Sequence, residues 1–337
     1  MQHHDIVVIG GSMGSLDVLK QILGGLPADL PASVCIVTHM PANHGGTLAP
    51  VLQKYSRLPV QLAEEGAPLR PGRIYVAAPD RHLLIEDGRI VLGHGPRENL
   101  SRPAIDPLFR SAALSRGSRV IGIVVTGMLN DGAAGLAAIK RCGGLAIVQS
   151  PSDAISDSMP LSAIDATEVD AIVPASDIAS QIVRMVGEPA GPASPAPSDL
   201  RLEVDIARGG RCDTSTISQI AHPAALTCPS CHGVLSQIEG GHPLRFRCQV
   251  GHGFTAEVLE ATQEEQVDEA LRVALRIIEE RVELVRRMAR EARDNSRLAV
   301  AELYEKRHEE FSAYADSIRR AVLLKMEPQP EPETVSG

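Results

Sequence analysis

Residues 5–15 read DIVVIGGSMGS, and this stretch decides the fold that the sequence predicts. The four apolar residues 6–9 are typical of a buried strand, and the paired glycines Gly10 and Gly11 allow a sharp turn into a helix that begins near Ser15. Ser12 is therefore expected on a strand-to-helix turn at the carboxyl edge of a sheet. Backbone N–H groups at the start of the helix can stabilise negative charge beside its hydroxyl.

Two other interpretations fit the same stretch. A dinucleotide-binding fingerprint needs Gly-x-Gly-x-x-Gly, but counting from Gly10 places Ser12 and Ser15 at the second and third glycine positions. A plain glycine turn, in which Ser12 only caps the following helix, is the simpler structural alternative. The choice between these interpretations depends on the rest of the chain.

Length, charge and cysteine usage bound the possible functions. The chain has 337 residues and a formal net charge of -9, which fits about two domains and disfavours a nucleic-acid partner, since phosphate binding needs a clustered basic face. We find no basic-then-apolar leader and no apolar run of membrane length, so we expect a soluble cytoplasmic protein without membrane insertion. Half of the 6 cysteines fall in one short segment, which favours a bound metal over a disulfide scaffold.

Strand-like runs alternate with helical patterns as far as about residue 186. This alternation predicts an α/β fold with a doubly wound, mostly parallel sheet and helices on both faces. The expected strands are 6–9, 34–38, 119–125, 145–149 and 170–173, and the expected helices are 15–26, 105–115, 133–141 and 177–186. In the middle, residues 73–77, 82–86 and 89–92 have the pattern of short strands with a tight turn at Asp87-Gly88, so we expect an antiparallel edge there.

Two further polar residues follow expected strands. His39 comes directly after strand 34–38, and Asp131 lies in the glycine-bounded segment TGMLNDG that follows strand 119–125. Because the carboxyl ends of parallel strands meet at one edge of a sheet, Ser12, His39 and Asp131 can converge there. They would supply a nucleophile, a base and a carboxylate that orients the base. The simpler alternative makes Asp131 only the N-cap of the next helix.

Five segments, in this order, extend the pattern: VVIGGSMGS, THMP, YVAAPDRHL, RPAIDPLFRSAA and VVTGMLNDGAAGL. Together they resemble the catalytic domain of the chemotaxis protein-glutamate methylesterases of the CheB type, over residues 5–186. The resemblance implies that Ser12, His39 and Asp131 form a catalytic triad that needs no cofactor. It also implies hydrolysis of γ-glutamyl methyl esters on the cytoplasmic helices of chemoreceptors, with release of methanol, and in many members deamidation of receptor glutamines.

The same resemblance leads to candidate oxyanion donors and to differences from the family pattern. The backbone N–H groups of Met13 and Met128 are the expected donors, and the Met128 side chain is either part of the glutamyl slot or, more commonly for such a position, part of the core. The family's nucleophile turn reads close to GASTGG, so Gly11, Met13 and Ser15 depart from it, and Leu129 stands where glycine is frequent. These differences leave the substrate preference open.

Regulation is expected to differ as well. Typical members carry a phosphorylatable receiver domain ahead of the catalytic domain, whereas this chain starts directly on its first expected strand. We therefore expect no receiver domain, and regulation by a partner, by the C-terminal extension, or not at all.

A metal-binding pattern follows the catalytic segment, which we assign to residues 1–186. Residues 187–199 are rich in Pro, Ala, Gly and Ser and predict a linker. In residues 200–255, the pairs Cys228-Pro-Ser-Cys231 and Cys248-Gln-Val-Gly-His252 have the ligand types and spacing of a tetrahedral zinc site. We expect a small zinc ribbon with a structural Zn2+ on Cys228, Cys231, Cys248 and His252.

Alternatives remain open in this segment. An unmetallated or redox-active CxxC pair would explain only the first half of the pattern, and His232 or His242 could replace His252. Nearer the linker, Leu202, Val204 and Ile206 alternate like a strand but identify no site.

Residues 256–326 show apolar residues at steps of three and four, which predict a hairpin of two amphipathic helices of about 26 residues each. The hairpin either buries its own apolar stripes or serves as a docking module for a receptor, a regulator or a second copy. The tail, residues 327–337, is rich in Pro and Glu and is expected to be disordered.

The sequence thus predicts a methylesterase with a Ser-His-Asp triad, a zinc ribbon and a helical hairpin. Two alternatives stay open: a catalytically weak scaffold of a chemosensory-type pathway, and an esterase for another methyl ester.

Overall fold

The computed structural model describes residues 3–39, 47–192 and 194–324. Its internal contacts divide the chain into two compact units, Met1–Leu259 and Glu260–Gly337. The tail 327–337, for which the sequence predicts disorder, lies outside the described residues. Within the described ranges, no helix has both the length and the apolar character that a bilayer crossing requires.

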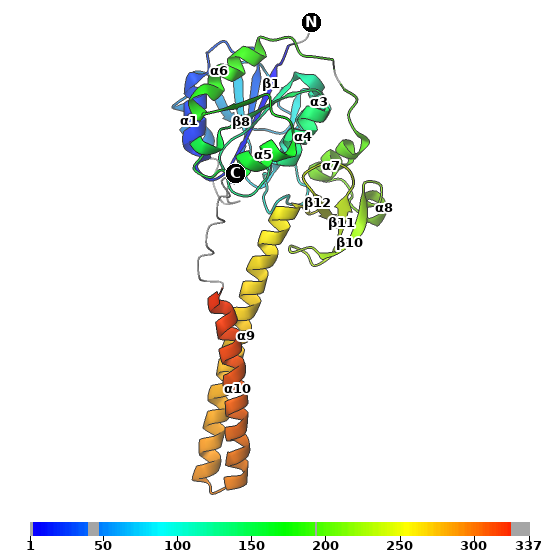
Figure 1. Cartoon of the computed structure of the whole chain (residues 1–337). Coiled ribbons are helices and arrows are strands. Elements are labelled where there is room, and N and C mark those ends of the chain that lie inside the picture. The colour runs from blue at the N-terminus through cyan, green and yellow to red at the C-terminus, as the bar shows by residue number, and fades with distance from the viewer. Residues whose placement is uncertain (1–2, 40–46, 193, 325–337) are drawn as a thin grey trace, which may run out of the picture. The chain divides into compact units, whose positions relative to one another are not determined.

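A seven-stranded sheet forms the centre of the first unit (Figure 1), in the order β3-β4-β2-β1-β7-β8-β9. Each pair of neighbouring strands is parallel. Strands β1, β2 and β7 are buried along their whole length, as their continuous apolar sequence predicts for a sheet covered on both faces. The strands are β1 (Ile6–Gly11), β2 (Ser33–Thr38), β3 (Val60–Leu62), β4 (Arg73–Val76), β7 (Val120–Val124), β8 (Leu145–Gln149) and β9 (Ala171–Val173).

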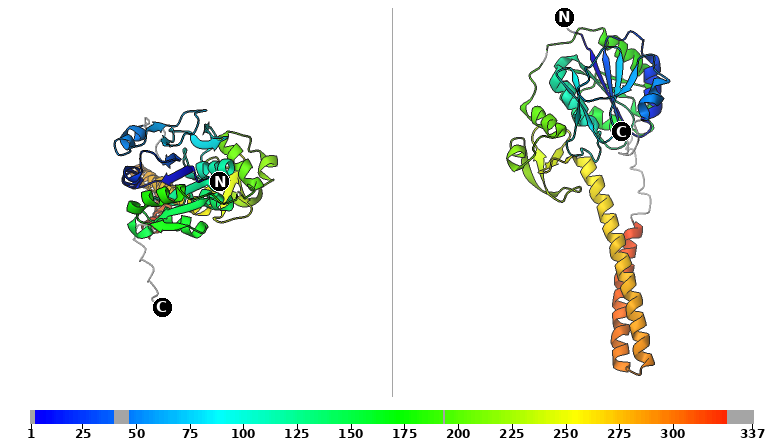
Figure 2. Two further views of the ribbon diagram at one scale, coloured as in Figure 1. Left: turned by 90° about the horizontal axis from the view of Figure 1, so that it is seen from above. Right: turned by 180° about the vertical axis from the view of Figure 1, so that it is seen from behind.

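Helices cover both faces of this sheet (Figures 1 and 2), so the predicted doubly wound α/β class is confirmed. The side chains of β1 alternate between two cores: Val7 and Ile9 join the core beneath the first group of helices, and Ile6 and Val8 the core beneath the second. The first group is α1 (Ser15–Gly25), α2 (Leu48–Gln53) and α6 (Ala175–Val186), and the second is α3 (Ile105–Arg116), α4 (Ala133–Arg141) and α5 (Ser158–Ala166). Two short 3-10 helices, Gly117–Arg119 and Pro151–Asp153, complete this part.

The expected antiparallel edge is wrong in one respect. Strand β4 pairs in parallel with β2 and β3 and belongs to the main sheet. Of the three strands expected at this edge, only β5 (His82–Glu86) and β6 (Arg89–Gly93) are antiparallel, and they form a separate two-stranded hairpin. Its turn carries Asp87 and Gly88 at positive φ, as the sequence predicts for a tight hairpin turn.

A smaller part of the first unit, residues 198–255, is called the C-terminal module below. It contains α7 (Ser198–Arg208), α8 (Thr214–Ile217) and an antiparallel sheet of β10 (Ala221–Thr227), β11 (Val234–Ile238), β12 (Arg245–Cys248) and β13 (Gly253–Thr255). The strand suggested for Leu202, Val204 and Ile206 is wrong, because this segment is helix α7. The buried positions Leu200, Glu203, Ile206 and Ala207 have helical spacing, and a charged residue among them hid the pattern.

The second unit contains most of a helical hairpin, α9 (Ala256–Asp294) and α10 (Leu298–Leu324). The helices have 39 and 27 residues, so the first is much longer than the expected 26. Its extra residues lie at its beginning, where Glu and Gln favour helix without adding an apolar stripe. Val285, Ala289 and Ala292 of α9 and Ala301 and Ala315 of α10 are buried.

Candidate active site

Ser12 follows β1 directly and is fixed by the turn after β7. Its N–H donates to the Thr126 carbonyl (3.0 Å), and the Thr126 hydroxyl donates to the carbonyl of Met13 (3.1 Å). The next turn residue, Gly127, packs against Ser12 so closely that a Cβ at position 127 would lie 2.8 Å from the Ser12 Cβ. Glycine at 127 is therefore a steric requirement for placing the serine at this edge of the sheet.

His39 lies just past β2, the strand beside β1. Its backbone N–H donates to the carbonyl of Gly11 (3.4 Å), the residue before Ser12. The His39 side chain is 21% exposed. The His39 Nε2 atom lies 2.7 Å from Asp131 Oδ2. The structure thus pairs His39 with Asp131 and brings Ser12 to the same edge, while within the described residues no hydrogen bond joins the Ser12 hydroxyl to His39. Since Asp131 occupies Nε2, the nitrogen left for a proton from serine is Nδ1.

Asp131 is buried and accepts four hydrogen bonds. Oδ2 accepts from His39 and from the N–H of Ile105 (2.7 Å), and Oδ1 accepts from Asn99 Nδ2 (3.0 Å) and from the N–H of Asp106 (3.2 Å). Burial opposes its ionisation, but the hydrogen bonds from His39, Ile105 and Asn99 outweigh burial and lower the pKa of Asp131 below its ordinary value. Asp131 is therefore a charged, fixed partner for the His39 ring.

The N-cap role suggested for Asp131 applies to a different helix from the expected one, and Asp106 makes the reciprocal contact. Asp131 precedes α4 but accepts from the first N–H groups of α3, whereas Asp106 in α3 accepts from Gly132 (3.0 Å) and Gly135 (2.7 Å) at the start of α4. Burial and the neighbouring charge of Asp131 raise the pKa of Asp106 to about 7. The pair therefore carries its negative charge on Asp131, next to His39.

Met13 and Met128 flank the serine turn, with 53% and 52% of their surfaces exposed. The alternative that placed Met128 in the core is wrong. Within the described residues neither backbone N–H has a hydrogen-bond acceptor, so both are available as donors. Leu129 follows with φ of 60°, the left-handed conformation that glycine adopts without strain.

Sequence reasoning missed Asn99 as part of the site. Asn99 is 7% exposed, and its Nδ2 donates to both Asp131 and Asp106 (3.0 and 3.3 Å). It lies in an irregular segment without periodicity, so no local pattern could have identified it. Its position between two carboxylates is visible only in the fold.

The four predicted metal ligands come together in the C-terminal module. Donor atoms of Cys228, Cys231, Cys248 and His252 all lie within 4.8 Å of one another. The Cys231 and Cys248 sulfurs are 3.6 Å apart, and His252 Nδ1 lies 3.6 Å from Cys248 and 3.8 Å from Cys228. A tetrahedral ion with bonds of about 2.1–2.3 Å separates its donors by roughly 3.5–3.8 Å, so the arrangement fits such an ion. The alternative ligand His242 instead contacts Asp165 (2.6 Å).

A parallel α/β sheet with a serine and a histidine–aspartate pair at its carboxyl edge is an arrangement that serine hydrolases use. The chain belongs to the CheB methylesterase family, whose sequence model matches residues 7–182. A putative protein-glutamate methylesterase/protein-glutamine glutaminase of Leptospira interrogans is 40% identical over 184 residues, which cover 54% of this chain and 95% of the relative.

Two further comparisons agree with this family membership. The protein-glutamate methylesterase/protein-glutamine glutaminase of Symbiobacterium thermophilum is 38% identical over 184 residues, 54% of this chain and 51% of that protein. The crystal structure of the Thermotoga maritima CheB methylesterase catalytic domain matches with a TM-score of 0.52 and 34% identity, covering 54% of this chain and 98% of that one. The C-terminal module and the hairpin lie outside the matched family segment.

Proposed function

We propose that the chain is a protein-glutamate methylesterase with Ser12 as nucleophile, His39 as general base and Asp131 as the orienting carboxylate. The observation that carries the proposal is the 2.7 Å contact of His39 with a charged, buried Asp131 at the edge where Ser12 follows β1. Together with membership of the CheB methylesterase family, it favours an active enzyme over a degenerate scaffold.

In the proposed reaction, Ser12 Oγ attacks the ester carbonyl of a γ-glutamyl methyl ester while His39 Nδ1 takes its proton. The N–H groups of Met13 and Met128 stabilise the oxyanion, each contributing about 3–4 kcal/mol. His39 then protonates the leaving methoxide, and methanol departs. Water, deprotonated by His39, cleaves the acyl-serine to a glutamate carboxyl and free Ser12; a glutamine substrate would release ammonia by the same steps.

The proposed substrates are methylated glutamates on the cytoplasmic helices of chemoreceptors, which places the protein in the cytoplasm. The exposed Met13 lies where a threonine hydroxyl is usual in the family, so the choice among receptors is expected to differ. We further propose that the long hairpin α9–α10 serves as the docking element, because apolar Ile277, Leu284, Leu303 and Tyr314 on it are each 45–59% exposed.

We also propose a structural Zn2+ on Cys228, Cys231, Cys248 and His252. All four positions come from the protein, so the ion would cross-link the module and leave no position for water. The proposed division remains residues 1–186 for catalysis and 200–255 for the zinc ribbon. In the linker assigned to 187–199, helix α7 already begins at Ser198.

The test is release of radiolabelled methanol from a methylated receptor cytoplasmic domain by the full chain and by Ser12→Ala. Release by the wild type, and a loss of at least about 10³-fold in the variant, would support the proposal. Equal rates would exclude Ser12 as nucleophile. Binding of receptors without any release would favour the scaffold alternative, and release only from small methyl esters would favour a different esterase.

A further inference from the structure

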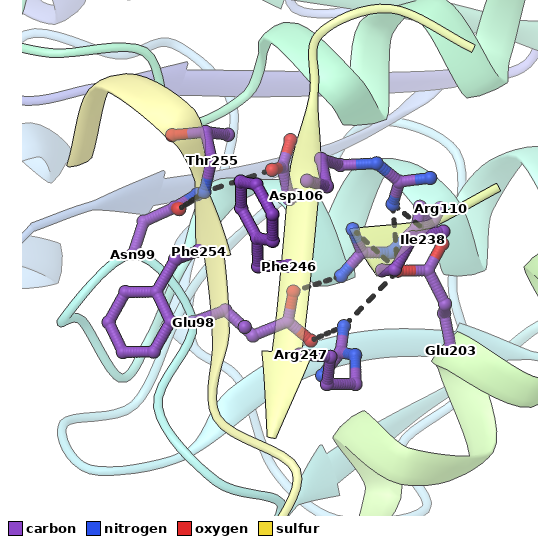
Figure 3. Close-up of a pocket in the computed structure, with 12 residues that line it drawn as sticks. Glu98, Asn99, Asp106, Arg110, Glu203, Ile238, Phe246, Arg247, Phe254 and Thr255 are labelled. Carbon is purple, nitrogen blue, oxygen red and sulfur yellow. Dashed lines mark hydrogen bonds and ion pairs between the residues drawn. The ribbon is translucent and has the colours of Figure 1, made fainter. Parts of the chain in front are cut away.

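Thr255 of the C-terminal module contacts two residues that adjoin Asp131, Asn99 and Asn130. This residue ends β13, is 1% exposed, and uses both of its hydrogen-bond donors toward the catalytic domain. Its backbone N–H donates to Asn99 Oδ1 (3.0 Å), and the other end of the same amide donates to Asp131 (3.0 Å). Figure 3 shows Asn99, Thr255 and Asp106 grouped at this contact.

The Thr255 hydroxyl makes a second connection. It donates to Asn130 Oδ1, and Asn130 Nδ2 donates to Glu257 at the beginning of α9. Asn130 is 1% exposed and immediately precedes Asp131 in the chain. Thr255 therefore holds two residues that adjoin Asp131: Asn130, which precedes it in the chain, and Asn99, which donates to its carboxylate.

A backbone hydrogen bond and buried ion pairs also join the module to the segment that contains Asn99. The N–H of Asn99 donates to the Gly253 carbonyl (2.9 Å), which registers β13 along the catalytic domain. Glu98, the neighbour of Asn99, forms ion pairs with Arg110 of α3 and with Arg247 of β12 (Figure 3). Glu203 of α7 completes this buried charge cluster through Arg247 (3.2 Å) and Arg245 (2.7 Å).

We propose that Thr255 is a positioning residue for the esterase, so that the C-terminal module is a working part of the active site and not an independent appendage. The inference rests on the proposed function of Ser12, His39 and Asp131. Thr255 touches no substrate; it acts by holding Asn99 and Asn130, which fix the carboxylate that orients His39. Loss of one of its two connections shifts Asp131 and lowers the rate of the chemical steps without changing substrate binding.

The test compares Thr255→Val, which keeps the shape and removes the hydroxyl, with Thr255→Ser, which keeps the hydroxyl. Thr227→Val is the matched control, since Thr227 is an exposed strand residue of the same module. We expect kcat for methanol release to fall about tenfold in Thr255→Val, because small misplacements of catalytic groups cost one to two powers of ten. KM should change less than about twofold, and Thr255→Ser should retain most of kcat.

A second readout separates this inference from the proposed function. The rate at which a fluorophosphonate labels Ser12 in the full chain reports serine activation without any natural substrate. Labelling that slows about tenfold in Thr255→Val but not in Thr255→Ser, with unchanged circular dichroism, supports positioning even if no receptor is a substrate. Equal labelling and kcat in wild type and Thr255→Val, equal losses in both Thr255 variants, or a loss confined to KM would each overturn it.

Discussion

The charge cluster between the module and the catalytic domain makes a quantitative prediction for Glu203→Gln. Glu203 is 1% exposed, and both of its oxygens lie 2.7 Å from Arg245 Nη1, with Arg247 at 3.2 Å and Arg110 at 3.7 Å. Glutamine keeps the volume and removes the charge. Arg110 and Arg247 then keep only the Glu98 carboxylate, and Arg245 loses its ion pair with Glu203.

Removing one partner of a buried ion pair typically costs about 3–5 kcal/mol, because the remaining charge stays buried without compensation. Each 1.4 kcal/mol is a factor of ten, so local opening of the module should become roughly 10² to 4 × 10³ times more frequent. Burial opposes the ionisation of Glu203, but Arg245, Arg110 and Arg247 outweigh it and hold its pKa below the ordinary 4.5. Its contribution to stability is therefore complete above about pH 4.5 and is lost as the pH falls toward the folded-state pKa.

Hydrogen exchange of the β12 amides, residues 245–248, is the appropriate assay because it isolates the module from the hairpin. Glu188→Gln is the matched control: its pair with Arg184 is 46–53% exposed and should contribute at most about 1 kcal/mol. Exchange in β7 should stay unchanged in both variants. If β12 exchanges within threefold of the wild-type rate in Glu203→Gln, the charge cluster does not hold the module in place.

Three further predictions follow from single features. Leu129→Gly should raise the stability by up to about 1 kcal/mol, because it relieves the left-handed backbone at φ 60°; a lower Tm would refute this. Burial and Asp131 raise the pKa of Asp106 from 3.8 to about 7, so the native state holds an extra proton and loses stability as pH rises between these values. The stability of Asp106→Asn relative to the wild type should therefore increase from pH 4 to about 7 and stay constant above pH 7. Urea midpoints measured from pH 4 to 8 test this, and a difference that does not change with pH would contradict it. Elemental analysis should find one zinc per chain, and Cys248→Ser should lower both the zinc content and Tm; a metal-free wild type would disprove the site.

The sequence predicts the centre of the main sheet well because strands β1, β2 and β7 are buried on both faces. Continuous apolar runs such as residues 6–9 and 120–124 have few other structural solutions in a chain where helical patterns follow each run. The error at α7 falls where burial involves charge. Helix α7 turns Glu203 inward to meet arginines that are more than 40 residues away, and no local hydrophobic pattern contains that information.

The candidate site also has residues that the sequence predicts and residues that only the fold reveals. Ser12 and His39 can be predicted because each follows a recognisable strand, and parallel topology brings strand ends together. The environment of Asp131 cannot be predicted in this way, because its hydrogen-bond partners come from distant parts of the chain. Asn99 is 32 residues from Asp131, and Thr255 is 156 residues from Asn99. An N-cap assigned from sequence also cannot show that Asp131 and Asp106 cap each other's helices.

The Cys/His cluster and the proposed catalytic carboxylate, that of Asp131, are connected through one short hairpin. Cys248 ends β12, His252 precedes β13, and the N–H of Cys248 donates to the His252 carbonyl (3.0 Å). These two residues of the Cys/His cluster therefore enclose the turn between β12 and β13, and β13 ends at Thr255. An ion bound there would restrict β13, and β13 holds Asn99 and Asn130. Removal of the metal should therefore slow the labelling of Ser12 as well as reduce stability, and in Thr255→Val the slowing should be smaller, because one of the two connections is already broken.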